Sequence, residues 1–217
     1  EYGLSAINSF KKTINIIKDL DMTIDIDIEL DTTELFHYNN SSPQDLSIVT
    51  ECDRFLRDIG KTKLETSGKR NRCWAYVIAA AWSKSLNDRN WKDHLQRDIS
   101  DKTILQYLRS AQRGMEQEDF RKHYCSDDDN FFHTIKEDIT HNIRDIRKSL
   151  KKVNNEFASH HIFAAMICDK DDNAPLKRYG GLKMYKSGNS DYYDIQDNKL
   201  DTLEVAHTDG NHFSFVL

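Results

Sequence analysis

The sequence predicts an α+β fold in which a helical N-terminal and middle part packs on a small, mostly antiparallel C-terminal sheet. Several long segments before residue 158 carry apolar residues at the spacing of a helix with one buried face. From Ile162 onward the apolar residues fall in short runs separated by Gly, Asn and Asp, which is typical of strands and turns. A chain of 217 residues can form one sizeable core, so we expect a single domain, 1–217.

The N-terminal third predicts two helices and a strand, followed by a loop. Apolar residues at helical spacing predict a helix from Leu4 to Leu20, and strict alternation with acids predicts a half-exposed strand from Ile24 to Leu30. Ser42 is the expected cap of a second helix that has Pro43 in its first turn, runs to about Ile59 and stops at Gly60. Residues 61–72 are polar and mostly basic, which predicts a loop.

The rest of the chain predicts three helices and then four short strands. The expected helices are Cys73 to about Leu86, Ser100 to about Glu118, and Thr134 to about Phe157. The expected strands are Ile162–Cys168, Leu182–Tyr185, Thr202–His207 and His212–Leu217. Ser126–Asn130 reads as an exposed loop, and Thr208-Asp209-Gly210-Asn211 is a good hairpin turn between the last two strands.

Composition excludes several classes of protein. A formal net charge of −5 argues against a dedicated binder of nucleic acid or of anionic membranes. The longest apolar runs are far shorter than the ~18 residues of a membrane span, so we expect none. The cysteines, at positions 52, 73, 125 and 168, lie far apart and form no Cys-x-x-Cys pair, which predicts reduced thiols.

Cys73 is the strongest candidate for a reactive residue because it stands where a basic loop meets an apolar helix. The dipole of the helix favours a thiolate at its N-terminus, and the nearby cations Lys69, Arg70 and Arg72 act in the same direction. A thiolate is the nucleophile of cysteine enzymes. The alternative interpretation is that Cys73 is only the first buried residue of a core helix.

A nucleophilic cysteine requires a base, and histidine fills that role near neutral pH. Of the nine histidines, His212 is the best candidate because it opens a core strand directly after a tight turn. His161, which precedes an apolar run, is the second candidate. The absence of any catalytic histidine remains the third possibility.

These segments resemble those of known cysteine peptidases. Cys73-Trp74-Ala75-Tyr76 resembles the nucleophile segment of papain-like cysteine peptidases, and Asn71-Arg72-Cys73-Trp74 is similar to the Asn-x-Cys-aromatic step of the ubiquitin-specific peptidases. Gly210-Asn211-His212-Phe213 resembles the Gly-x-His-aromatic that carries their base, or the His-aromatic of ovarian-tumour-type deubiquitinases. A cysteine on an early helix and a histidine on a late strand follow the order of that superfamily.

The resemblance implies a papain-like domain with a helical insertion at about 88–158. It implies that the Cys73 thiolate attacks a carbonyl and that the His212 imidazolium protonates the leaving amine. Backbone N–H groups at Cys73, with the Asn71 side chain, would stabilise the oxyanion. Position 67 is Ser67, where papain relatives have the Gln of the oxyanion hole.

The third member of a catalytic triad stays open at this point. Ser214 stands two residues past His212, where ovarian-tumour-type enzymes place the Asp or Asn that orients the ring. Asp194, Asp209 and Asn71 are the candidates for this role. If His161 were the base instead, Asp194 would be its natural partner.

We therefore predict a cysteine peptidase or isopeptidase whose protein substrate is ubiquitin or a ubiquitin-like protein. The alternatives are a transferase or glutamine deamidase that uses the same Cys–His pair, and a non-catalytic protein-interaction module. The Asn-, Asp-, Lys- and Ile-rich composition is typical of AT-rich microbial genomes. We expect a cytoplasmic protein, placed in the host cytosol if it is a secreted microbial effector. There is no signal peptide at Glu1, and both chain ends look truncated.

No metal or cofactor is expected. Asp169-x-Asp171-x-Asn173 matches the first half of a calcium loop, but Ala174 and Gly180 replace its Gly and its final Glu. His123 and Cys125 have no second ligand pair at zinc spacing. Glycine patterns for phosphate binding are also missing from the sequence.

Overall fold

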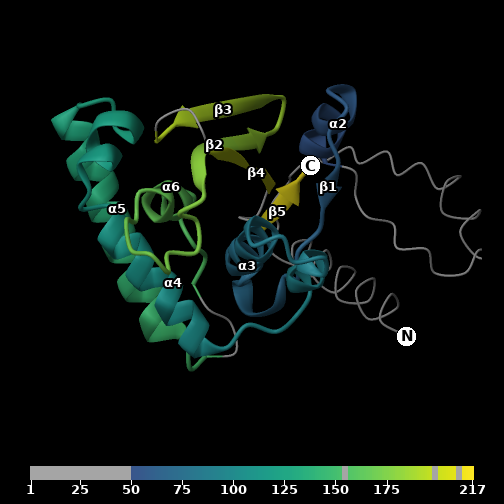
Figure 1. The fold of residues 1–217 in the computed structure, drawn as a ribbon, viewed down its shortest axis with the longest axis horizontal. Coiled ribbons are helices and arrows are strands. Elements are labelled where there is room, and N and C mark those ends of the chain that lie inside the picture. Colours follow the sequence, from purple (N-terminus) through teal and green to yellow (C-terminus); the bar gives the residue numbers. More distant parts are fainter. Residues whose placement is uncertain (1–49, 153–155, 197–199, 209–211) are drawn as a thin grey trace, which may run out of the picture. The chain divides into compact units, whose positions relative to one another are not determined.

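The computed structural model describes residues 50–152, 156–196, 200–208 and 212–217. The predicted α+β class is confirmed, because helices fill most of the described residues up to Ile167 and the sheet is built mainly from the residues after it (Figure 1). The elements are α2 (Glu51–Asp58), β1 (Lys63–Leu64), η2 (Lys69–Asn71), α3 (Cys73–Ser85), η3 (Trp91–Leu95), α4 (Asp101–Gly114), η4 (Phe120–Tyr124), α5 (Asp129–Ser149), α6 (His161–Ile167), β2 (Tyr179–Lys186), β3 (Asn189–Asp194), β4 (Asp201–Thr208) and β5 (His212–Val216). The helix predicted at 4–20 and the strand predicted at 24–30 lie outside the described residues.

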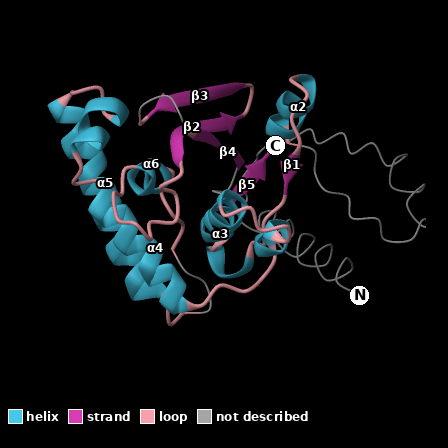
Figure 2. Cartoon of the chain, viewed as in Figure 1, coloured by secondary structure: helices cyan, strands magenta, loops and turns pink. Residues whose placement is uncertain are grey.

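The sheet has five strands in the order β1-β5-β4-β2-β3 (Figure 2). Three of its four pairings are antiparallel: β1 with β5, β5 with β4, and β2 with β3. The fourth, between β2 and β4, is parallel. The sheet is therefore mixed and mostly antiparallel, as the sequence predicts, and β5 lies between β4 and the short edge strand β1.

Alternating side chains on the strands build two separate apolar clusters. Residues such as Leu203 and Phe213 join the large core formed with α3, α4, α5 and α6. Tyr185 and Ala206 point the other way and pack with Cys52 and Leu56 of α2. Because neighbouring strand residues point to opposite faces, α2 covers one face of the sheet and the remaining helices cover the other.

Helix α3 is the central helix of the domain, and its predicted extent is confirmed. Nearly every residue from Cys73 to Ala81 is buried, which is the pattern of a helix that is covered on all sides. The helix packs against β5 on one side and η3 on another. This packing fixes its first residue relative to the strand that begins at His212.

The strand predicted at Ile162–Cys168 is wrong, because these residues form the helix α6 instead. Every residue of α6 from Ile162 to Ile167 is buried, so the segment has no polar positions whose spacing could distinguish the two-residue period of a strand from the 3.6-residue period of a helix. A short apolar run of this kind is compatible with either structure. The close approach of α6 to α4 at Gly114, together with the good helix former Ala at two positions, accounts for the outcome.

Two helix starts and two other segments also differ from the predictions. Helix α2 begins at Glu51, because Thr50 is extended and caps it through a reciprocal bond with Asp53; the predicted start at Ser42 lies outside the described residues. Helix α5 begins at Asp129 rather than Thr134, since the Asp128 side chain accepts from Phe131 N–H. The predicted loop 61–72 contains β1 and η2, and the strand β3 had no counterpart among the predictions.

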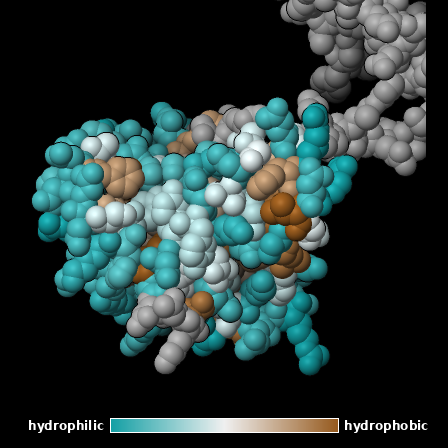
Figure 3. All heavy atoms as spheres, turned by 90° about the horizontal axis from the view of Figure 1, so that it is seen from above, coloured by the Kyte–Doolittle hydropathy of each residue, from teal (hydrophilic) through white to brown (hydrophobic). Residues whose placement is uncertain are grey.

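Helices α4 and α5 end earlier than predicted, at Gly114 rather than about Glu118 and at Ser149 rather than about Phe157, whereas several other predictions are borne out. β4 and β5 pair antiparallel with Thr208 opposite His212, as the predicted hairpin requires, although its turn lies outside the described residues. All four cysteines are buried thiols, and no disulfide is formed. The face in Figure 3 is mostly hydrophilic with separate hydrophobic spots. Within the described ranges, no helix combines the length and the apolar character that crossing a membrane requires.

Candidate functional site

The site forms where the N-terminus of α3 meets the start of β5. Cys73 is the first residue of α3, and His212 is the first residue of β5. A hydrogen bond joins the Cys73 side chain to the His212 ring. The structure therefore brings together the two residues that the sequence singles out, and it does so through the contact between one core helix and one core strand.

Glu65 also contacts the His212 ring, and the sequence alone did not predict this residue. Its Oε2 atom is 3.3 Å from His212 Nε2. The same carboxylate accepts a hydrogen bond of 2.8 Å from Ser214 Oγ, and its Oε1 atom lies 2.6 Å from Lys63 Nζ. Ser214 and Lys63 thus fix the orientation of Glu65, and Glu65 in turn orients the imidazole.

Electrostatics make the imidazole cationic at neutral pH. The hydrogen bond to Cys73 and then the bond to Glu65 raise the pKa of His212 to about 9, against the opposing effect of burial. The bond to His212 is also the largest influence on Glu65, and together with Lys63 and Ser214 it lowers the pKa of that carboxyl to about 2. Near pH 7 the site therefore holds an imidazolium between a carboxylate and a sulfur.

Strand pairing explains why Glu65 reaches His212. Leu64 of β1 lies opposite Phe215 of β5, so the chain continues antiparallel past Ser214 toward His212. Thr66 follows with its hydroxyl buried, donating to Phe213 O at 2.5 Å and lying 3.4 Å from His212 Nε2. The alternation of Thr62, Leu64 and Thr66 with charged residues is the strand signal that could have located Glu65.

The loop before Cys73 has an unusual backbone. Arg70 and Asn71 both have φ of +56°, in the left-handed region that L-residues rarely adopt. Each such residue costs about 1 kcal/mol or more and persists only where its surroundings hold it. The Arg70 guanidinium bonds to Leu150 O and to Lys152 O, which provides such an anchor.

The arginines beside Cys73 have partners other than the thiol. Arg72 is 4% exposed, and its guanidinium bonds to Ile99 O at 2.6 Å and to Asp101. Arg70 lies 3.6 Å from the same carboxylate. The two arginines tie the loop to the start of α4, and the ring of His212 bonds to the thiol.

His161, the second candidate base, has a different environment. It opens α6, and its Nδ1 atom is 2.6 Å from the hydroxyl of Tyr124. Its ring also contacts His160, with 4.0 Å between the ring centroids. Burial lowers the pKa of His161, which favours the neutral ring. The histidine that bonds to Cys73 is His212.

The carboxylate beside the His212 ring belongs to Glu65, which was not among the predicted third residues. Asp194 ends β3, which β4 and β2 separate from β5, a lateral distance of roughly 14 Å at the usual strand spacing. Asn71 ends η2, two residues before the cysteine, and Asp209 lies outside the described residues. The carboxylate comes instead from a segment that precedes Cys73 in the chain.

The comparisons with known proteins give no family for this arrangement. No protein-family model matches the chain, and no curated protein is significantly similar to it. The functional argument therefore depends on the geometry of Cys73, His212 and Glu65 and on the short sequence resemblances.

Proposed function

We propose that this protein is a cysteine peptidase or isopeptidase of papain-like architecture, with Cys73 as nucleophile, His212 as acid and base, and Glu65 as the residue that orients His212. The observation that carries the proposal is the hydrogen bond between Cys73 and the His212 ring, whose Nε2 atom lies 3.3 Å from a carboxylate oxygen of Glu65. A nucleophile bonded to a base that a third group orients is the arrangement that covalent catalysis requires.

The other thiols provide a contrast within the same molecule. Burial raises the pKa of Cys125 to about 11, and it also raises the pKa of Cys168. Both are fully buried cysteines that behave as small apolar residues. Cys73 differs because a polar, titratable ring contacts its sulfur, and this favours the catalytic interpretation over that of an inert interaction module.

The mechanism follows from the charges. The Cys73 sulfur, as thiolate, attacks the carbonyl carbon of the substrate, and the His212 imidazolium gives its proton to the leaving amine. The first N–H groups of α3 point out of the helix end, where they can stabilise the oxyanion. The neutral imidazole then takes a proton from water, whose oxygen attacks the thioester and releases the carboxylic acid and the thiolate.

A ubiquitin or ubiquitin-like protein is the substrate class we propose. Its support is the similarity of Asn71-Arg72-Cys73-Trp74 and Gly210-Asn211-His212-Phe213 to the corresponding segments of deubiquitinases. Cys73 is only 3% exposed, whereas the side chain of His212 is 30% exposed. The substrate has to reach a sulfur that is almost entirely covered, which favours a slender acyl donor over a folded surface.

The test uses ubiquitin that carries a C-terminal propargylamide, which forms a stable adduct with a nucleophilic active-site cysteine. We expect one adduct, on Cys73, in the wild-type protein. We expect none in Cys73→Ala, and a much slower reaction in His212→Ala. Cys125→Ala serves as the control, because that thiol has no imidazole partner in our mechanism. Two outcomes would refute the peptidase proposal. One is an adduct on any other cysteine. The other is the absence of an adduct in the wild type, together with no reaction of Cys73 with small alkylating agents.

A further inference from the structure

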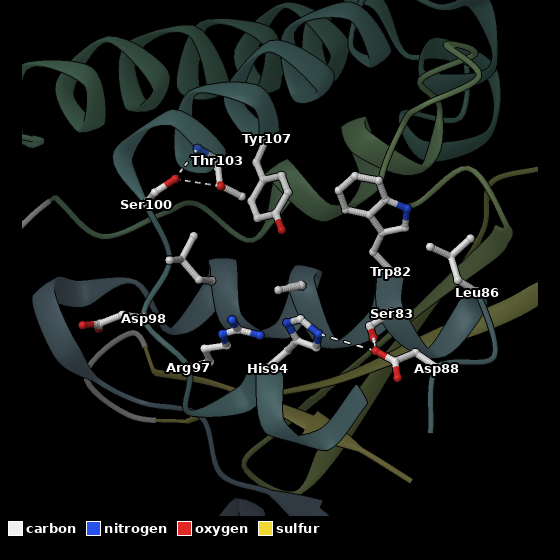
Figure 4. Close-up of a pocket in the computed structure, with 12 residues that line it drawn as sticks. Trp82, Ser83, Leu86, Asp88, His94, Arg97, Asp98, Ser100, Thr103 and Tyr107 are labelled. Carbon is white, nitrogen blue, oxygen red and sulfur yellow. Dashed lines mark hydrogen bonds and ion pairs between the residues drawn. The ribbon is translucent and has the colours of Figure 1, made fainter. Parts of the chain in front are cut away.

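A hollow lies along α3, away from the first turn of the helix, which carries Cys73. It has a volume of about 520 Å³, within the usual range for small-molecule sites. Figure 4 shows its side chains converging from α3, from the segment around η3 and from the start of α4. None of Cys73, His212 and Glu65 lines it. The proposed mechanism makes no use of this hollow.

The walls of the hollow are aromatic and aliphatic. Trp82 comes from α3 and Tyr107 from α4, while Ile99 lies in the connection between η3 and α4. Leu86 lies at the end of α3 and is 54% exposed, so its side chain is available to a ligand in the hollow. A flat apolar body would bury these surfaces together.

The hydroxyl of Tyr107 points into this hollow (Figure 4). Tyr107 is 2% exposed, and its hydroxyl makes no hydrogen bond to any residue in the described part of the chain. The hydroxyl oxygen is not among the fully buried atoms without a partner, so it is open to the hollow, where a ligand can accept its hydrogen bond. Burial raises the pKa of Tyr107, so the hydroxyl remains a neutral donor.

Arg97 supplies a second donor. Its guanidinium points toward the centre of the hollow in Figure 4, and it forms no ion pair with any described residue. The nearby acidic side chains, Asp88 and Asp98, do not pair with the Arg97 guanidinium. Asp88 accepts from Ser83 Oγ at 2.6 Å and from Asn90 N–H at 2.9 Å, and Asp98 points away from the hollow and lies 3.5 Å from the Tyr76 hydroxyl.

We propose that this hollow binds a small aromatic carboxylate. Its aromatic body would lie between Trp82 and Tyr107, and its carboxylate would accept hydrogen bonds from the Tyr107 hydroxyl and the Arg97 guanidinium. An anion is favoured over a neutral ligand, because both of these donors are unsatisfied and one is cationic. The aromatic walls favour a planar body over an aliphatic chain.

The experiment is a calorimetric titration of the purified protein with 2-naphthoate, using naphthalene-2-carboxamide as the uncharged comparison. We expect saturable binding of one naphthoate and about tenfold weaker binding of the amide. Arg97→Gln and Tyr107→Phe should each weaken naphthoate binding by about five- to tenfold. Lys92→Gln is the matched control, because it removes a positive charge from η3 without touching the hollow, and it should leave the affinity unchanged.

Two results would overturn this site: no saturable binding of naphthoate at millimolar concentration, or an equal loss of affinity in Arg97→Gln and Lys92→Gln. Arg97 is exposed, so its substitution does not threaten the fold. Cys73→Ala should bind naphthoate as the wild type does. The outcome is therefore independent of whether the protein is a peptidase.

Discussion

Glu65 Oε2 lies 3.3 Å from His212 Nε2, and this contact joins the segment after the edge strand β1 to the first residue of β5. It places a carboxylate and a thiol on the same imidazole, although the carboxylate precedes the cysteine in the chain. The orientation of the ring therefore depends on a two-residue strand, β1, being paired with β5.

Glu65→Gln should weaken the nucleophile without unfolding the protein. The amide keeps the size of the side chain but lacks the charge that helps to hold the His212 ring protonated beside the sulfur. We expect about 10- to 100-fold slower modification of Cys73 by iodoacetamide at pH 7, a typical cost of losing a residue that orients a reactive group. Mass spectrometry after timed quenching measures the rate at each cysteine.

Glu116→Gln is the matched control for this prediction, because Glu116 pairs with Lys136 on the exposed surface of the helical part. It should leave the rate at Cys73 unchanged. If Glu65→Gln were also without effect, Glu65 would have no positioning role, and the site would reduce to the pair Cys73 and His212.

His212 should make the native state less stable at alkaline pH. Its pKa is raised from the ordinary 6.5 to about 9, so its contribution is complete below about pH 6.5 and is lost as the pH rises through 9. The side chain is 30% exposed, so we expect its contribution to the free energy of unfolding to be about 2 kcal/mol, less than the full pKa shift would give. Urea unfolding at pH 6 and pH 9.5, compared between wild type and His212→Ala, measures it. A stability difference that stays constant over this range would contradict the ionic coupling.

The sequence located the two central residues because each one stands at a clear boundary. Cys73 begins an uninterrupted apolar helix, and His212 begins a strand after a predicted turn, so helix and strand periodicity were sufficient to single out both. It did not locate Glu65, because β1 is only two residues long and lies in a polar stretch. Only its pairing with β5, a contact between distant parts of the chain, gives that stretch its structure.

The error at Ile162–Cys168 has a different cause. Every side chain from Ile162 to Ile167 is buried, so the sequence has no polar positions there that would indicate which face is exposed to solvent. The boundary of α5 was missed because the acids at 127–129 read as a loop, whereas Asp128 acts as the cap of a helix. In both segments, the deciding information was tertiary packing or a single capping bond.

Gly114→Ala should strongly destabilise the packing of α4 on α6. A Cβ atom at this position would lie 1.6 Å from Ala165 O and 2.6 Å from Ala165 C, and the neighbouring backbone of a buried helix cannot move aside easily. We expect a loss of about 3 kcal/mol in the free energy of unfolding, read from urea denaturation. Gly68→Ala is the control, since its φ is −82° and an added Cβ would meet no atom within 4 Å. Equal stability of the two variants would show that α4 and α6 do not approach as closely as described.

His160 should make the protein sensitive to acid. Burial first, and then the charges of His161, Lys186 and His207, lower the pKa of His160 to about 3. Between pH 6.5 and 3 the unfolded chain therefore binds a proton that the native state excludes. The stability that is present above pH 6.5 falls by as much as about 1.4 kcal/mol per pH unit over that interval.

In His160→Gln this part of the acid dependence should disappear, so the variant should lose less stability than the wild type between pH 6 and pH 4. His133→Gln, on the exposed surface of α5, should keep the wild-type slope. Urea midpoints at half-unit intervals of pH give the slopes, and identical slopes for all three proteins would mean that His160 is protonated in the native state as readily as in the unfolded chain.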